Sequence, residues 1–126
     1  MFFEITATYA ASLGILTAAL GFATVIMRAK LSISSGDGDN GAMLRAIRSH
    51  GNLTEYMPIF LIILLLLENA AVSAIWLHAL GITFVIGRAL SVVYFWLSQK
   101  FVLRVLAFWG AVLPIAAGSL LLFLNS

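Results

Sequence analysis

Three polar residues stand at helical spacing in the middle of this largely apolar chain, and their types suit the binding of a charged ligand. Arg48, Asn52 and Glu55 occupy positions i, i+4 and i+7, so on a helix that turns about 100° per residue they fall on one narrow stripe. Two further arginines, Arg88 and Arg104, follow later in the sequence. Guanidinium groups bind carboxylates and phosphates, and a neighbouring carboxylate can bind an ammonium group. Whether these residues can act together depends on the helices that carry them.

The composition places these residues in a membrane protein. The chain has 126 residues, of which 63% are hydrophobic and 10% are charged. An ordinary soluble domain is about 45–50% apolar and about 25% charged. Such an apolar composition is typical of a protein whose solvent is bilayer lipid. The length suits one compact domain over residues 1–126, and we expect an all-α bundle of membrane helices.

Four apolar segments are each long enough to cross the hydrocarbon core, which takes about 20 helical residues. They predict helices over residues 5–27, 42–68, 73–97 and 101–124. The first segment is longer than the core of a secretory signal peptide and has no basic residue before it, so a membrane span is the preferred interpretation. The connection that follows is rich in Gly, Asp and Asn, which marks a loop, and Asp39 or Asn40 can cap the second helix. The other two connections are short, so neighbouring helices should be antiparallel.

Arg88 lies deep in the third predicted helix. It stands nine residues before the end of that helix, or about 14 Å along the axis at the usual helical rise. A charged side chain at that depth costs about 2.5–3.5 kcal/mol or more unless it is paired or wetted. Arg104 opens the fourth helix, and the antiparallel order brings both arginines to the side of the membrane that holds the polar stripe of the second helix. We therefore expect all five side chains to converge.

Two interpretations of this cluster remain open. A buried ion-pair network could fix the register of the helices, with Glu55 pairing either Arg48 or Arg88. One carboxylate, however, cannot neutralise three cations. The excess positive charge of Arg88 and Arg104 favours an anionic ligand.

The basic residues also predict the orientation of the helices, because short cytoplasmic loops carry an excess of Lys and Arg. The second connection and both termini hold none, whereas the first and third connections and their edges hold Arg28, Lys30, Arg45, Arg48, Lys100 and Arg104. We expect both termini outside and the polar cluster toward the cytoplasm.

Several kinds of chemistry find no support in the sequence. The chain has no cysteine, which excludes disulfides and thiolate metal sites, so any thiol must come from a cofactor. Asp37 and Asp39 fit a turn better than a metal site, and His50 has no His or Cys partner at zinc-binding spacing. The net charge is only +2 and forms no basic run. We therefore expect no metal and no nucleic-acid partner.

The segment Arg48-Ser-His50-Gly-Asn52-Leu-Thr-Glu55-Tyr56-Met-Pro58 resembles the signature of the membrane-associated proteins in eicosanoid and glutathione metabolism, the MAPEG family. The resemblance covers essentially the whole chain, since four helices follow in order with Arg88 in the third and Arg104 opening the fourth. The Gly-Asp-Gly loop looks most like that of small bacterial members. This resemblance implies a bacterial inner membrane protein.

The resemblance also implies a homotrimer with glutathione bound between subunits. It assigns the catalytic role to Arg104, whose cation would face the glutathione sulfur and stabilise the thiolate. The implied glutathione-binding residues are Arg48, Asn52, Glu55, Tyr56 and Arg88. Glutathione carries two carboxylates, which suit arginines, and one ammonium group, which suits Glu55.

The sequence departs from the family pattern at two positions of the third helix. Ser91 stands where family enzymes often have His or Tyr, and Phe95 stands where they often have Tyr. Tyr94, one residue earlier and about 100° around the helix, is the neighbouring tyrosine and is expected to contribute to cofactor binding. Both departures remove polar contacts to glutathione.

The resemblance implies a membrane glutathione transferase or peroxidase that acts on an apolar electrophile or a lipid hydroperoxide. The alternative is a non-catalytic protein on the same scaffold that binds a lipid or a fatty acid. An anion carrier is less favoured, because the sequence shows no repeat of broken helices.

Overall fold

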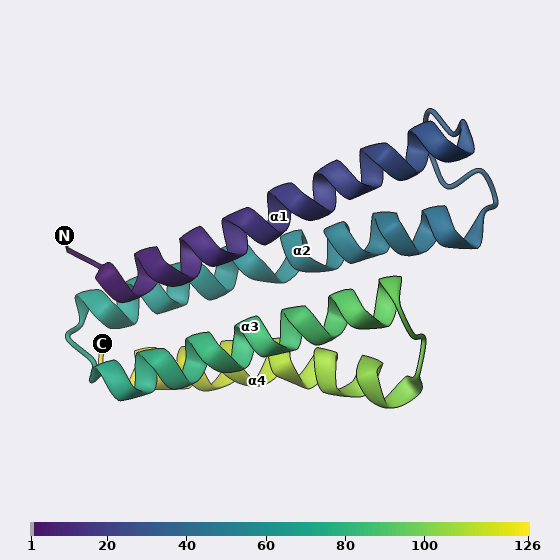
Figure 1. Cartoon of the computed structure of the whole chain (residues 1–126). Coiled ribbons are helices and arrows are strands. Elements are labelled where there is room, and N and C mark those ends of the chain that lie inside the picture. The colour runs from purple at the N-terminus through teal and green to yellow at the C-terminus, as the bar shows by residue number, and fades with distance from the viewer. Residues whose placement is uncertain (1) are drawn as a thin grey trace.

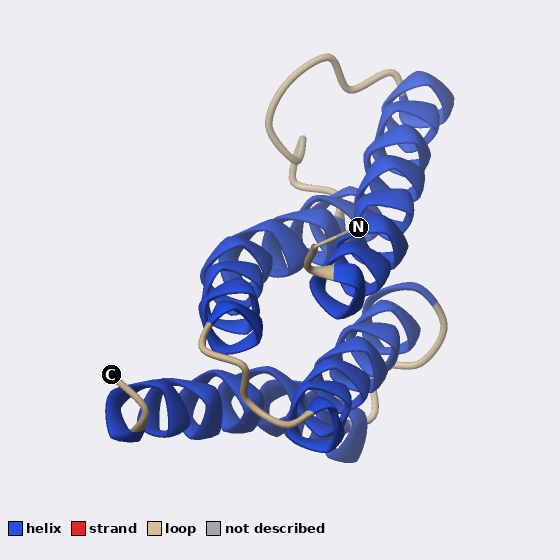
Figure 2. Cartoon of the chain, turned by 90° about the vertical axis from the view of Figure 1, so that its left-hand side faces the viewer, coloured by secondary structure: helices blue, strands red, loops and turns tan. Residues whose placement is uncertain are grey.

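Four long helices and their connections make up the computed structural model, which describes residues 2–126 (Figure 1). The helices are α1 (Glu4–Leu31), α2 (Gly41–Asn69), α3 (Ala74–Trp96) and α4 (Phe101–Leu124). Every expected helix is present, and α1 continues four residues beyond the predicted end at Met27. The described residues contain helix and loop alone (Figure 2). The expectation of an all-α bundle is confirmed.

The second helix holds the bundle together. It packs against α1, α3 and α4, whereas α1 reaches α3 but does not contact α4. Figure 1 shows α1 and α2 lying along one side and α3 and α4 along the other, with both termini at the same end. Consecutive helices are antiparallel, as the short connections from α2 to α3 and from α3 to α4 predict.

All four helices are long and apolar enough to cross a membrane. Their outer faces carry large apolar side chains that the single chain leaves exposed, among them Phe22, Ile62, Ile86, Leu113 and Phe123. Exposure of so much apolar surface is unfavourable in water, but it is not unfavourable in the hydrocarbon of a bilayer. The bundle therefore has the surface of an integral membrane protein.

Side-chain hydrogen bonds order the connection between α1 and α2. Asn40 caps α2, because its Oδ1 accepts a hydrogen bond of 3.0 Å from the backbone N–H of Met43. In the last turn of α1, Arg28 donates at 2.8 Å to the carbonyl of Gly36 in the loop before α2, and Gly36 has the positive φ of 66° that glycine adopts freely. The expected asparagine cap is confirmed.

The opposite end of α1 is capped by a residue of another helix. The Glu68 carboxylate, at the end of α2, accepts hydrogen bonds from the backbone N–H groups of Ile5 and Thr6 at 2.9 and 2.8 Å. It also accepts one from the Thr6 hydroxyl at 2.6 Å. Tyr9, one turn further along α1, makes a 2.9 Å hydrogen bond with Nδ1 of His78 on α3. The two backbone bonds to Glu68 satisfy donors that a helix start otherwise leaves free.

Two glycines set the distance between α3 and α4 beside the polar cluster. A Cβ atom built on Gly87 would lie 2.6 Å from the carbonyl carbon of Gly110 and 2.7 Å from its Cα atom. The two backbones are therefore in direct contact, which is how small residues let membrane helices approach. The rings of Phe60 and Phe84 stack nearby with centroids 4.0 Å apart, and this contact packs α2 against α3.

Replacing Gly110 by alanine should destabilise the bundle. The new methyl group would meet the backbone of Gly87 rather than a movable side chain, and overpacking of this kind costs about 1–3 kcal/mol. The measurement is the thermal unfolding midpoint of the full chain in detergent. Gly14→Ala is the matched control, because no atom lies within 4 Å of a Cβ built there. Equal midpoints for the two variants would contradict the close packing of α3 and α4.

Candidate functional site

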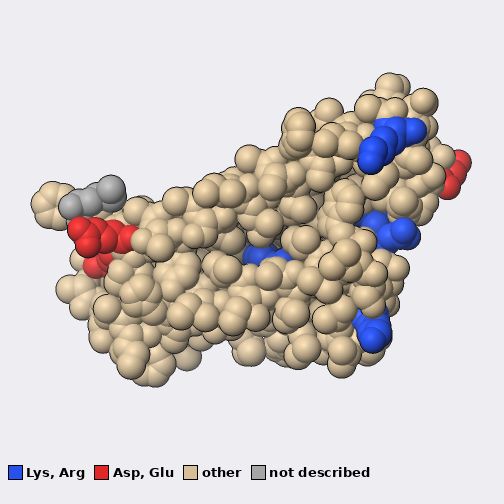
Figure 3. Space-filling view, in the orientation of Figure 1, with Lys and Arg blue, Asp and Glu red and all other residues tan. Residues whose placement is uncertain are grey.

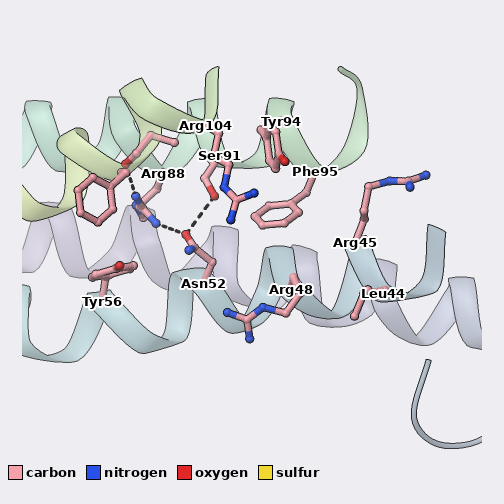
Figure 4. Close-up of a pocket in the computed structure, with 12 residues that line it drawn as sticks. Leu44, Arg45, Arg48, Asn52, Tyr56, Arg88, Ser91, Tyr94, Phe95 and Arg104 are labelled. Carbon is pink, nitrogen blue, oxygen red and sulfur yellow. Dashed lines mark hydrogen bonds between the residues drawn. The ribbon is translucent and has the colours of Figure 1, made fainter. Parts of the chain in front are cut away.

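A cavity of about 460 Å³ lies between α2, α3 and α4 (Figure 4). This volume falls within the range of about 300–1,000 Å³ that small-molecule sites occupy. Its apolar lining comes from Leu44, Phe95, Ala107 and Phe108, and its polar lining from Arg45, Arg48, Asn52, Tyr56, Arg88, Ser91, Tyr94 and Arg104. The lining includes four cations and no carboxylate.

Arg88 is the most deeply placed of these cations, with 1% of its surface exposed. Its Nη1 donates to Oδ1 of Asn52 on α2, and its Nη2 donates at 2.6 Å to the carbonyl oxygen of Ala107 on α4. The guanidinium carbon lies 5.1 Å from the centre of the Tyr56 ring and 5.6 Å from that of Phe84. One side chain thus joins three helices through directed hydrogen bonds and ring contacts.

Asn52 accepts hydrogen bonds from two residues of α3. Its Oδ1 accepts from Arg88 and also from the hydroxyl of Ser91 at 3.0 Å. Ser91 is buried, so its short side chain is used within the protein rather than left at the surface. The Nε atom of Arg88 is buried and has no hydrogen-bond partner in the described chain.

Glu55 pairs with Arg48 instead of joining the cavity. Two parallel contacts of 3.1 and 3.2 Å join the guanidinium to the carboxylate, and both side chains are about half exposed, at 45% and 55%. Arg48 lines the cavity, whereas Glu55 does not. The expected convergence therefore holds for Arg48, Asn52, Arg88 and Arg104 and stops short of Glu55.

Arg104 projects into the cavity from the start of α4 and remains exposed. Its guanidinium carbon lies 5.9 Å from the centre of the Tyr94 ring. Among the residues that the structure describes, neither Arg104 nor Arg88 forms a salt bridge. The positive charge of these two arginines is thus left without a carboxylate, which is the imbalance that the sequence predicted.

Charge is unevenly distributed along the whole bundle. Figure 3 shows basic side chains over the end that holds the α1–α2 and α3–α4 connections. Acidic side chains lie at the opposite end and at the tip of the first loop (Figure 3). A cavity that opens among cations concentrates anions, because the surrounding helices form a low-dielectric wall.

Sequence reasoning found most of the polar lining but missed part of it. It included Tyr56 and Tyr94, which both line the cavity. It missed the carbonyl of Ala107, since a backbone acceptor leaves no mark in a sequence. It also missed that Ser91 bonds to Asn52, although the two small polar side chains lie at similar depth on adjacent helices.

Comparisons with known proteins identify a family and two bacterial relatives. The model of the MAPEG family matches residues 6–124. The chain is 32% identical over 84 residues to the inner membrane protein YecN of Escherichia coli strain K12, and equally to that of Escherichia coli O6:H1 strain CFT073. Each match covers 67% of this chain and 64% of the relative, which is less than two thirds of the relative's length. No solved structure matches the chain.

Replacing Arg88 by lysine should destabilise the fold. A single ammonium group on a thin stem cannot donate to Asn52 and to the Ala107 carbonyl in the forked geometry of a guanidinium. Loss of a buried hydrogen bond to a charged group costs about 1.5–3 kcal/mol. Thermal unfolding in detergent measures the effect. The control is Arg104→Lys, since Arg104 is exposed and should lose almost nothing; an equal loss in both variants would contradict the role given to Arg88.

Proposed function

The chain belongs to the MAPEG family, and from this premise we propose that it is a membrane-bound glutathione transferase or peroxidase. Its second substrate would be an apolar electrophile or a lipid hydroperoxide. The observation that carries the proposal is the cavity lined by Arg45, Arg48, Arg88 and Arg104 without a carboxylate. A ligand with several negative groups is what such a lining attracts.

The chemistry of the lining can be tested against glutathione. Its two carboxylates and its thiolate suit the cations and the donor groups of Asn52 and Tyr56. Its ammonium group needs an acceptor, and the candidate is Glu55, which lies beside Arg48 and is about half exposed. The anionic groups of glutathione therefore match the charge of the cavity lining, and its ammonium group would have to reach Glu55, which lies outside the lining beside Arg48.

The roles of the residues follow from their places. Glutathione would supply the thiol on which the reaction depends. Arg104 projects into the cavity without a carboxylate partner, so its fixed cation can stabilise a thiolate. Phe95 and Phe108 offer an apolar surface beside it, where an apolar second substrate can lie. The Arg104 guanidinium lies over the Tyr94 ring, and this cation–π contact favours the position of the cation.

The membrane setting supports this assignment. Four helices of membrane length and an inner membrane relative support an integral protein of a bacterial inner membrane. Within it, the excess of Lys and Arg at one end favours a cytoplasmic cavity with both termini outside. The assembly we propose is a homotrimer, for which the exposed apolar faces of the helices leave ample surface.

One observation favours the alternative function. A second hollow of about 400 Å³ lies between α3 and α4, and its lining is almost wholly apolar, with Trp76, Leu80, Leu113 and Leu121 among its residues. A non-catalytic protein that binds a lipid or fatty acid could use such a groove. It would have no need of the unpaired cation of Arg104.

Glutathione should bind to the detergent-solubilised protein, which isothermal titration measures. Glu55→Gln should weaken binding, because the ammonium group loses its carboxylate. Saturation at about 100 times the dissociation constant should stabilise the fold by about 2.7 kcal/mol. Absence of heat and of thermal stabilisation at millimolar glutathione would remove the proposed function.

Turnover should distinguish the two candidate functions. The wild type should conjugate 1-chloro-2,4-dinitrobenzene or reduce cumene hydroperoxide with glutathione. Arg104→Ala should lower kcat by about 10²–10³-fold, the usual cost of one electrostatic donor to a developing anion, with a smaller change in glutathione affinity. A wild type that binds fatty acid but turns over neither substrate would support the alternative.

The orientation can be measured with single cysteines, since the chain has none of its own. Ser35→Cys lies in the first loop and Ser126→Cys at the C-terminus, and both positions are exposed. In right-side-out membrane vesicles, an impermeant maleimide should label position 126 and leave position 35 unlabelled until detergent is added. The reverse pattern would contradict the proposed orientation.

A further inference from the structure

We propose that Ser91 is a positioning residue that, together with Arg88, turns the NH2 group of Asn52 toward the cavity to bind a carboxylate of glutathione. This inference rests on the proposed function and names how one part of the site recognises its ligand. It assigns a role to the serine that stands where family enzymes often have His or Tyr.

The first step is the identity of the Asn52 atom that faces Arg88. A guanidinium carries N–H donors and no acceptor, so the atom that it approaches must be the carbonyl oxygen Oδ1. The hydroxyl of Ser91 donates to the same oxygen at 3.0 Å. A carbonyl oxygen has two lone pairs. Both are therefore occupied by groups of the third helix, as the dashed lines in Figure 4 show.

The second step concerns the other half of the amide. With Oδ1 held by α3, the Nδ2 atom of Asn52 has no hydrogen-bond partner in the described chain. Asn52 is only half buried and lines the cavity. An amide NH2 group can only donate. It thus presents two neutral donors to a ligand in a cavity that also holds four cations.

The third step is why this orientation is stable. Turning the amide by 180° would set its NH2 group against the Arg88 guanidinium, so two donors would face each other and a buried charged group would lose its acceptor. The Ser91 hydroxyl could still accept from the turned amide, but it would no longer donate to Oδ1. Ser91 and Arg88 therefore favour the same rotamer of Asn52.

The substitution that tests this directly is Asn52→Asp. The aspartate keeps one oxygen for Arg88 and Ser91, and its second oxygen replaces the NH2 group that faces the cavity. We expect the midpoint of thermal unfolding without glutathione to stay at or above that of the wild type, because Arg88 gains an opposite charge. Binding of glutathione, measured by isothermal titration with the full chain in detergent, should fall more than about 100-fold, since a carboxylate now opposes a carboxylate.

Ser91→Ala tests the positioning role. Loss of one hydrogen bond to Oδ1 should weaken glutathione binding by about 5- to 10-fold. In an Asn52→Ala background, the same substitution should cause no further loss, because Ser91 acts through Asn52. Ser12→Ala is the matched control, since that exposed hydroxyl bonds within α1 to the carbonyl of Thr8. It should leave binding unchanged.

The outcomes separate this inference from the proposed function. A wild type that does not bind glutathione overturns both. A wild type that binds, with Asn52→Asp binding equally well, overturns the inference alone. So does an equal effect of Ser91→Ala with and without Asn52. If Ser91→Ala yields no folded protein, the Asn52→Asp result decides.

Discussion

The burial of one guanidinium group is the constraint on which the rest of the site depends. Arg88 is almost wholly removed from the surface, and a cation in that position is tolerated only where its donors find oxygen atoms. The chain supplies these from Asn52 on α2 and from the backbone of Ala107 on α4. Because these groups belong to three helices, satisfying one charge also fixes the relative positions of the three helices.

The glycine contact between α3 and α4 makes this possible. The backbone of α4 must come close enough for the carbonyl of Ala107 to reach a side chain rooted on α3. Gly87 precedes Arg88 directly, and its contact with Gly110 brings the helices together at that level. The polar cluster and the close helix packing are therefore two parts of one arrangement. The cavity forms beside them, where the larger side chains of Phe95 and Phe108 line the space between the helices.

The sequence predicted the helices and the meeting of Arg88 with Asn52, and it left open whether Glu55 would pair with Arg48 or with Arg88. Membrane spans can be predicted from sequence because a helix that crosses the hydrocarbon core must have a minimum apolar length. The depth of Arg88 in its helix predicted that it would need a polar partner. Glu55 shares a stripe with Arg48 two turns away, and the flexible arginine reaches it outside the cavity. Helical spacing specifies a face and does not specify which partner a long side chain selects. The role of Glu68 at the start of α1 left no local signal, because the two segments are 63 residues apart in sequence.

That distant contact of Glu68 bears on how the protein is assembled. The first backbone N–H groups of α1 are satisfied by a carboxylate that leaves the ribosome only after the whole of α2. Until then the backbone N–H groups of Ile5 and Thr6 lack this acceptor, and unsatisfied backbone groups are costly in lipid. The first two helices should therefore form a hairpin in which the end of α2 binds the start of α1 through Glu68. The polar stripe of α2 would then be presented, already oriented by α1, to α3 and α4 as they enter the membrane.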